Sequence, residues 1–464
     1  MRRQFLPVVA LVLLGATAAA AQESRSNTAD VDQIGDDNTA VIDQTGSRNF
    51  AGSETAPLLQ SGFWNALDIL QRGIGNSVGQ TADGLFQDGA LLTSTVFNWI
   101  DIDQLSDFNV IGSVLQTARG AVPLGANGLR VLQDGGEGNR VTSIRQVQGA
   151  GDARQIMSLR QTGTGNLISL AAQTAATDDR GERNYMRVAI TGSFNGTRGL
   201  TGVAARPETT VSGVVQEQGT ADDRGNGNEV DLTIIGDDND FGLRQGGRLN
   251  SMGLLTIVGD ENELGLRQDG DENDIAFSQI TGDRNRIGVD QFGTNRVELD
   301  TPGDIYDNDV LVLQQGDNSA VLLVAGDRNA VYADQDYLNG LGGTNLLALT
   351  VRGDDNFADI LQLGRNSLTL SWEGDGNNPG GLYGASPRPR LAEGLFVQIG
   401  LDNMAKGLTT GDGNGAALLQ RGDGNAATFT VVGDGNGLSL SQEGNANASM
   451  VWQNGQANMV DVQQ

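Results

Sequence analysis

Apolar and polar residues alternate along most of this chain, in short runs that are separated by glycine-rich turns. The alternation is clearest from 400 to 464, where an asparagine recurs every eleven residues. Asn436, for example, is followed four and six positions later by Leu440 and Gln442. Because successive side chains of a strand point to opposite faces, this spacing predicts one short strand per unit. The Gly-Asp-Gly-Asn sequences between the runs predict tight turns, since glycine readily adopts a positive φ.

The repeating unit is longer than one strand. Between 228 and 314, glutamine recurs every 23 residues, at Gln245, Gln268, Gln291 and Gln314, with other units between. This spacing predicts a coil of two strands and two turns, about 22 residues long. About fifteen such coils would stack into an array of roughly 70 Å at 4.7–4.8 Å per coil. We therefore expect an all-β fold, a parallel β-solenoid of strand-turn-strand coils with two facing parallel sheets, interrupted by loops.

Breaks in the pattern divide the chain. Residues 1–21 resemble a signal peptide, with Arg2 and Arg3 before an apolar run that is only about half the roughly 20 residues a membrane span needs. We therefore expect secretion, with no membrane span after signal cleavage. The remaining segments are irregular repeats at 22–195, an insertion at 196–224, repeats at 225–377, a Pro/Gly-rich insertion at 378–397 and regular repeats at 398–464. We expect the first insertion to protrude as a loop or to form a mobile connection, and 81–95 to be irregular.

Composition narrows the classes of function. Of the 464 residues, 58 are acidic and 30 are basic, which gives a net charge of −28 and disfavours binding to nucleic acid. Cysteine and histidine are both absent, which removes disulfides, thiolate metal sites and histidine-based proton transfer. Carboxylate pairs could still serve a β-helical polysaccharide lyase or hydrolase. Because the aspartates simply follow the turn period, we expect neither an enzyme nor a cofactor.

The inward positions suggest ladders of side-chain amides. Stacked coils place Asn over Asn and Gln over Gln, so that each amide would bond to the copies above and below. Such bonds would offset the cost of burying amides. In an alternative interpretation the asparagines only serve turns, where Asn tolerates a left-handed φ, but this leaves the glutamines unexplained. The candidate amide-ladder and assembly residues are Gln33, Asn38, Gln44, Asn65, Gln71, Asn436, Gln442, Asn447, Gln453, Asn458 and Gln464.

The segment from Gln33 to Gln44 has the arrangement Gln-x-Gly-x-x-Asn-x-Ala-x-x-x-Gln. It resembles the curlin repeat, the unit of the subunits of curli, a bacterial extracellular amyloid. Residues 60–71 are a close copy, 442–453 a degenerate one, and many units depart from the pattern, as at Val431. The resemblance implies stacked strand-turn-strand coils in a surface fibre, fimbria or pilus, with roles in cell adhesion and biofilm at the surface of a Gram-negative-type bacterium.

Two hypotheses of function follow. In the first, a secreted structural protein forms curli-like amyloid fibres by templated stacking of coils. Its partners would be other copies of itself, joined head to tail, or other curlin-like subunits, with outer-membrane export machinery as a further candidate. We expect both ends of the stack to lack a cap, because the chain stops on the inward residue Gln464. In the alternative, a monomeric β-solenoid surface adhesin binds partners through its inserted loops.

Two further residue types have alternative interpretations. The turn aspartates Asp412, Asp423 and Asp434 would be solvated charges that keep exposed edges apart, or weak calcium ligands. Of the tryptophans, Trp372 falls on an inward position and Trp452 on an outward one. Trp452 is therefore the better candidate for a contact surface.

Overall fold

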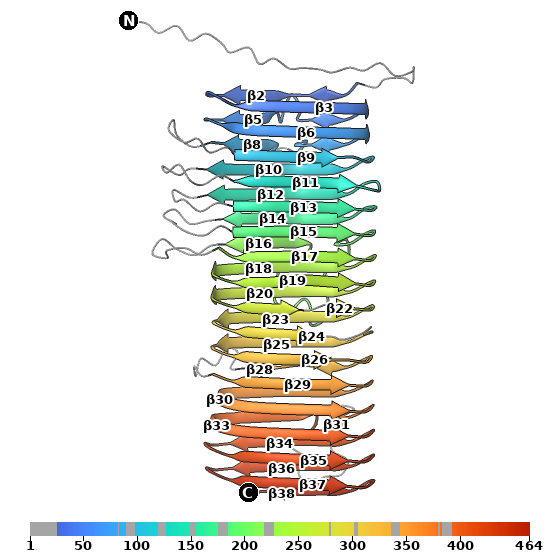
Figure 1. The fold of residues 1–464 in the computed structure, drawn as a ribbon, viewed down its shortest axis with the longest axis vertical. Helices are drawn as coiled ribbons and strands as arrows, with labels where there is room; N and C mark the ends of the chain where they lie inside the picture. The colour runs from blue at the N-terminus through green and yellow to red at the C-terminus, as the bar shows by residue number, and fades with distance from the viewer. Residues whose placement is uncertain are drawn as a thin grey trace, which may run out of the picture.

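The computed structural model describes residues 26–81, 83–89, 98–118, 127–148, 155–174, 184–217, 227–277, 280–300, 305–335, 344–378, 381–382 and 392–464. The predicted signal peptide, 1–21, lies outside the described residues. These contain 38 strands and no helix. Thirty-six of the strands form one hydrogen-bonded sheet that winds into a flattened stack (Figure 1).

Each coil of the stack contributes strands to two opposed faces. The first face holds β1 Thr28–Ala29, β2 Val31–Ile34, β4 Phe50–Ala51, β5 Leu58–Ser61, β7 Ser77–Val78, β8 Leu85–Asp88, β10 Val110–Ala118, β12 Arg140–Gln148, β14 Leu167–Thr174, β16 Gly213–Glu217, β18 Asp240–Arg248, β20 Glu263–Asp271, β23 Arg286–Gly293, β25 Asp309–Gly316, β27 Ala330–Val331, β28 Asp334–Gln335, β34 Gly415–Arg421, β36 Gly437–Glu443 and β38 Met459–Gln463. The second face holds β3 Thr39–Ser47, β6 Asn65–Ile74, β9 Asn98–Gln104, β11 Gly128–Asp134, β13 Gln155–Thr162, β15 Asn184–Thr191, β17 Glu229–Ile235, β19 Ser251–Val258, β21 Asp274–Phe277, β22 Ile280–Thr281, β24 Arg296–Asp300, β26 Ser319–Val324, β29 Leu346–Arg352, β35 Ala426–Val432 and β37 Ala448–Asn454. Two long strands, β30 Phe357–Glu373 and β33 Leu395–Thr410, run from the first face around the turn into the second.

Pairing between successive coils is parallel and in register. Strand β20 pairs with β18 on one side and β23 on the other, so that Leu266 lies between Leu243 and Val289. A separate antiparallel pair joins β31 Gly381–Leu382 to β32 Ala392–Glu393. The predicted all-β parallel solenoid is confirmed.

The core runs between the two faces along the whole stack. Inward aliphatic residues such as Leu266 and Ile257 form one continuous cluster of buried side chains. Outward neighbours, for example along β35, are half-buried, which gives the period-two pattern of the sequence. Burying each Leu, Ile or Val contributes about 1.5–3 kcal/mol relative to leaving it in water. This repeated core stabilises a chain that has no cysteine.

Glycine is required where the turns of successive coils lie against each other. Gly411 has a φ of 113°, and a Cβ there would overlap the backbone of Gly433 in the next coil. Any other residue would meet both the strain of a positive φ and this overlap. The recurring glycine therefore fixes the close stacking of the turns.

Parts of the segments that we expected to be irregular or inserted belong to the stack. Strand β8 lies within 81–95, β16 within 196–224, and the start of β33 within 378–397, and all three pair in parallel with neighbouring coils. The sequence pattern missed these strands because they are short or lack the asparagine that marks a unit. The stack is consequently longer than the fifteen coils we predicted.

The segment that precedes β16 packs against the first face instead of protruding. Residues 197–210, which we call the strap, cross the outer side of β18, β20 and β23 above Gly242, Gly265 and Gly288. A Cβ at Gly265 would overlap the carbonyl of Ala204, which is fully buried. The expectation of a protruding loop was therefore wrong for the strap. Its signal in the sequence was a glycine at the same outward position in three successive coils.

Candidate functional site

The first face carries a continuous column of glutamines, which we call the first-face Gln column. In each rung the Nε2 donates to the Oε1 of the glutamine one coil later; the distance from Gln268 to Gln291, for instance, is 3.1 Å. The column consists of seventeen residues, Gln33, Gln60, Gln87, Gln116, Gln146, Gln173, Gln216, Gln245, Gln268, Gln291, Gln314, Gln335, Gln362, Gln398, Gln420, Gln442 and Gln464. Sixteen steps of about 4.8 Å give a stack of roughly 77 Å.

The same amides tie the two faces together. The second hydrogen of Gln268 Nε2 is donated to the backbone carbonyl of Ser251 on the second face, at 3.0 Å. Gln245 donates in the same way to Glu229, also at 3.0 Å. A primary amide has two donors and an acceptor, so each buried glutamine can satisfy the column and the opposite face together. This arrangement makes a fully buried amide tolerable.

The corresponding column of the second face is only partly glutamine. It begins with Gln44, Gln71, Gln104, Gln133 and Gln161, joined by the same Nε2-to-Oε1 bonds of 2.7–2.8 Å. From Ile190 onward the position is mainly aliphatic, and glutamine returns at Gln453. Sequence reasoning found the alternation of Gln and non-Gln units. It did not show that one face keeps the glutamine throughout.

The asparagines also form two columns, one at each edge, which combine side-chain amide bonds of the predicted ladder with bonds to the backbone. The Oδ1 of Asn414 accepts the backbone N–H of Asn436 in the next coil, at 2.9 Å. The Nδ2 of Asn436 donates to the turn carbonyl of Gly455, also at 2.9 Å. The Nδ2 of Asn436 also donates to the Oδ1 of Asn414, at 3.2 Å. The asparagines therefore bond both to the backbone of neighbouring coils and to one another. Both the ladder and the turn interpretation describe part of this geometry.

The candidate residues all lie in these columns, with burial that depends on their place along the stack. Asn65, Gln71, Asn436, Gln442 and Gln453 are buried. The others, which belong to the coils at the two ends, are half-buried or exposed; they are Gln33, Asn38, Gln44, Asn447, Asn458 and Gln464. The end coils therefore present polar column residues to solvent.

The strands of the end coils have partners on one side only within the described residues. Strands β2 and β3 pair with β5 and β6, and β37 and β38 pair with β35 and β36. The inward apolar residues of these coils, including Ile42 and Val462, are only partly buried. The Oε1 of Gln453 is buried without a hydrogen-bond partner among the described residues. The end coils thus resemble rungs of the stack that lack one neighbour.

Comparison with known families identifies the repeat. The model of the curlin associated repeat matches at residues 18–52, 259–293, 411–444 and 433–464. The chain is a curlin-repeat protein. Curlin repeats form structural rather than enzymatic proteins, and their family is associated with the cell exterior. No curated protein matches the chain.

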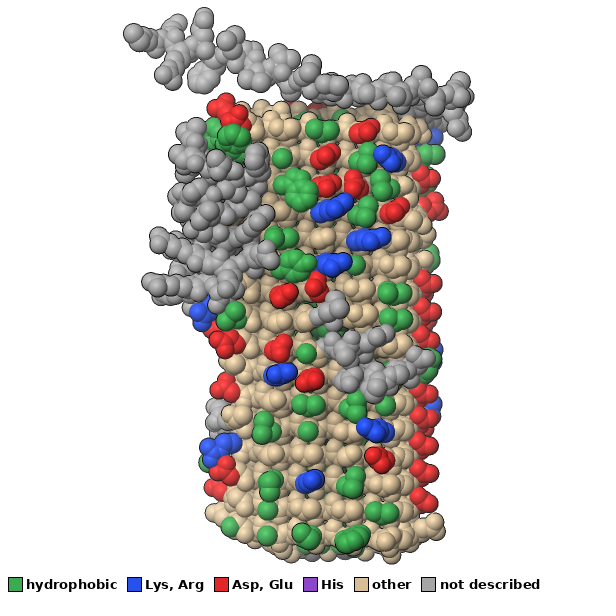
Figure 2. Space-filling model, viewed as in Figure 1, with side chains coloured by type: hydrophobic (Ala, Val, Ile, Leu, Met, Phe, Trp, Pro, Cys, Tyr) green, Lys and Arg blue, Asp and Glu red, His purple; other side chains and the backbone are tan. Residues whose placement is uncertain are grey.

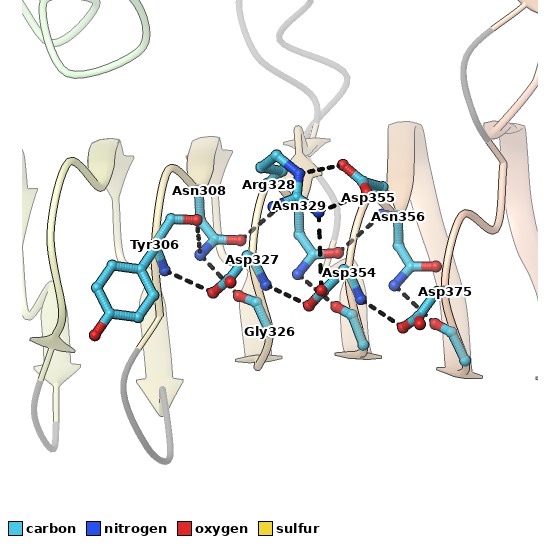
Figure 3. A network of polar contacts seen from close by, with 12 residues as sticks. Tyr306, Asn308, Gly326, Asp327, Arg328, Asn329, Asp354, Asp355, Asn356 and Asp375 are labelled. Carbon is cyan, nitrogen blue, oxygen red and sulfur yellow. Dashed lines mark hydrogen bonds and ion pairs between the residues drawn. The ribbon is translucent and has the colours of Figure 1, made fainter.

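Turn aspartates of this curlin-repeat protein form a third kind of column, along the edge that follows the second-face strands. We call it the Asp edge; its residues are Asp237, Asp260, Asp283, Asp327, Asp354, Asp375, Asp412 and Asp434. The Oδ1 of Asp375 accepts the backbone N–H of Asp354 at 2.9 Å, and the Oδ1 of Asp354 accepts the backbone N–H of Asp327 in the same way (Figure 3). Sequence reasoning missed this role. The repeated Gly-Asp sequence was its signal.

At the next turn position, opposite charges alternate over five coils of the Asp edge, at Glu261, Arg284, Asp307, Arg328 and Asp355. Arg328 Nε lies 2.6 Å from Asp355 Oδ1 (Figure 3). Arg284 Nε likewise lies 2.6 Å from Asp307 Oδ1. These hydrogen bonds lower the pKa of the Asp355 and Asp307 carboxyl groups. The pairs offset the repulsion that stacked carboxylates of one sign would suffer.

Several other predictions have structural outcomes. Trp372 is buried (1% exposed), whereas Trp452 projects outward (77% exposed), as predicted. Within the described ranges, no group of three or more acidic side chains is arranged to hold a metal ion. None of the described residues forms a helix long and apolar enough to cross a membrane.

Proposed function

We propose that this curlin-repeat protein is a secreted structural subunit that assembles into curli-like amyloid fibres by stacking end coil upon end coil. The observation that supports this most directly is the first-face Gln column, which repeats one bond from the first described coil to the last. The bond that joins coils within one copy can also join two copies. Self-assembly then needs no new kind of contact.

The direction of the bonds favours head-to-tail addition. Every glutamine of the first-face Gln column donates toward the later coil, so Gln33 is the rung that only donates within the column and Gln464 the rung that accepts from Gln442. One end of the stack therefore offers acceptors and the other offers donors. A copy that joins in the same direction continues the column, whereas a reversed copy places like groups together. Contacts of this heterologous kind produce open filaments.

The end coils also supply an apolar driving force. Val460 and Val462 at one end, and Val31 and Ile42 at the other, are half-buried inward side chains next to the core. Docking of a second copy would cover them and pair the free sides of β37 and β38. In a fibre at the cell surface, this mode of growth would serve adhesion and biofilm matrix.

Growth kinetics test the proposal. Replacing Gln453 and Gln464 by alanine together removes both inward glutamines of the last described coil. We expect preformed fibres to elongate at least about tenfold more slowly with this variant, measured by dye binding, because two buried amides lose their partners. The turn variant Gln456→Ala is the matched control, since Gln456 is exposed and outside the column. Equal elongation by all three proteins would contradict the proposed mechanism.

The adhesin alternative rests on inserted loops. The strap, which belongs to the first insertion, is packed on the first face and does not offer a free loop. Residues 218–224 of the first insertion, and 379–380 and 383–391 of the second, lie outside the described residues. Among the described residues of the insertions, no contact favours this alternative over assembly.

A further inference from the structure

Three arginines gather on the outer side of the second face, in an otherwise acidic protein. Arg130, Arg160 and Arg187 project from β11, β13 and β15, which are three successive coils. All three side chains are exposed. Figure 2 shows basic side chains close together over these strands, with acidic side chains beyond them in both directions along the stack. We call these residues the arginine patch.

Internal ion pairs neutralise the arginine patch only at its border. Arg130 lies 3.7 Å from both Asp101 and Asp103, in loose contacts with two half-buried carboxylates. Arg160 Nε donates to the hydroxyl of Thr162 at 3.3 Å. Among the described residues, no carboxylate lies within ion-pair distance of Arg160 or Arg187. Positive charge in this patch therefore remains available to an acidic partner.

The same chain has a matching row of carboxylates. Asp375, Asp412 and Asp434 also lie on three successive coils, at the end of the Asp edge, and all three are exposed. Their Oδ1 atoms accept backbone N–H groups, which fixes the carboxylates in a line. Each is followed by glycine, where earlier turns carry Arg284 or Arg328. This acidic row consequently lacks the arginines that neutralise the rest of the edge.

The two surfaces match in number and in their spacing along the stack axis. Each offers one charged side chain per coil over three coils, so each spans roughly 9.6 Å along the axis at about 4.8 Å per coil. Arg130 and Arg187 lie in one row on either side of Ser158, and Arg160 lies two positions later on its strand. We propose that the acidic row of one copy docks on the arginine patch of a second copy, so that stacks associate side by side. With parallel axes, the nine-coil separation between the two surfaces staggers the copies by about 43 Å.

This contact differs from the stacking of end coils. It joins different surfaces of the two copies, so each copy keeps one free patch and one free row, and the association stays open-ended. Neither surface includes an end coil. The lateral contact can therefore be tested, and can fail, whether or not the protein forms fibres.

Neutralising variants at fixed salt test the patch. We expect Arg130→Gln, Arg160→Gln and Arg187→Gln combined to weaken lateral association about tenfold at 0.15 M salt, measured by sedimentation velocity of the full chain before fibre growth. The matched control changes Arg140, Arg145 and Arg352, which are exposed elsewhere, to glutamine. It alters the net charge equally and should leave association unchanged. Equal effects of the two sets would overturn the proposal.

The acidic row gives a test of opposite sign. Combining Asp375→Asn, Asp412→Asn and Asp434→Asn makes the protein less negative, so general charge repulsion alone predicts stronger association. Our proposal predicts weaker association, because asparagine keeps the Oδ1 acceptor but loses the charge. The same change at Asp237, Asp260 and Asp283 is the control. Stronger association of the first variant would contradict the proposed contact.

Cross-linking locates the contact directly, because the chain has no cysteine of its own. Ser158 lies at the centre of the patch, and a Cβ at Gly413, at the centre of the row, would meet no atom within 4 Å. A mixture of the Ser158→Cys and Gly413→Cys proteins should form a mixed disulfide dimer, and a mixture of Ser367→Cys with Gly413→Cys should not. If the mixed dimer is absent, and the arginine variant instead loses binding to an acidic polysaccharide or to DNA, the patch serves that partner and our proposal is wrong.

Discussion

The last inward position of each strand is built differently on the two faces. The first face keeps glutamine in every coil, whereas the second face changes after Gln161 to mainly aliphatic residues such as Ile257. The glutamine and the aliphatic side chains at this position are both buried. An amide column tolerates burial only while each rung has identical neighbours, because a single gap leaves a donor and an acceptor without partners. An aliphatic column has no such requirement. We infer that the first face fixes the register of the coils and that the second face adds apolar burial.

The largest effect is expected where the aliphatic column carries its bulkiest residue. Trp372 is buried at this position and packs on Phe396, with ring centroids 5.8 Å apart. Trp372→Ala should destabilise the surrounding coils by about 3–5 kcal/mol, because it removes a large buried side chain and leaves a cavity. Hydrogen exchange of the amides of β30 and β33 measures this locally. Exchange as slow as in the parent protein would show that apolar burial on the second face contributes little.

A gap in the first-face Gln column should have the next largest effect. Gln291→Leu conserves bulk but leaves the Nε2 of Gln268 and the Oε1 of Gln314 without their partners. We expect a cost of about 2–4 kcal/mol, seen as a lower urea midpoint. The control is Asp269→Asn, which changes the outward-facing residue next to Gln268. If Gln291→Leu leaves the urea midpoint unchanged, the proposed difference between the two faces is wrong.

The reverse exchange on the second face should cost less. Ile257→Gln places an amide between Ile234 and Ile280, where no column neighbour can pair with it. We expect destabilisation of about 1–3 kcal/mol. Changing Ile234 to glutamine in the same protein should restore part of this stability, because the two amides can then bond. Additive losses in the double variant would contradict the proposed role of continuity.

Several of these features could be predicted from the sequence and others could not. The alternation after each asparagine established strands, turns and coils, because it recurs in almost every unit. The difference between the faces was visible in part, since Gln245 and Gln268 lie 23 residues apart with aliphatic units between them. The binding of the strap across Gly265 could not be found, because it joins segments that no periodicity links.

The direction and the partner of each hydrogen bond could not be predicted from the periodicity of the sequence either. Periodicity placed Asn414 and Asn436 one above the other, but it could not tell whether side-chain amides or backbone groups would receive their bonds. The same limit applied to Asp412, whose turn position suggested a solvated charge. The structure shows its Oδ1 as an acceptor for the coil before it. Turn geometry at this level depends on backbone angles that the residue types only restrict.

The smallest effect concerns exposed ion pairs at the edges. Arg248 and Asp271 are 2.6 Å apart, and their hydrogen bond lowers the pKa of Asp271 below 3.8. A carboxyl group whose pKa is lower in the folded protein stabilises the fold at pH values above its pKa in the unfolded chain. This stabilisation is lost as the pH falls through its pKa in the folded protein. Arg248→Met should therefore cost at most about 1 kcal/mol at pH 7. The difference should vanish in urea titrations carried out well below pH 3.8; a difference that persists there would show that packing, and not charge, is responsible.

X-ray diffraction from aligned fibres of the mature protein tests the central proposal, that copies continue the stack end to end. Our account predicts a reflection at 4.7–4.8 Å along the fibre axis, because the axis of each stack would coincide with the axis of the fibre, and a broader reflection near 10 Å across it. A protein that remains monomeric after prolonged incubation, or a 4.7–4.8 Å reflection that lies across the fibre axis, would contradict it.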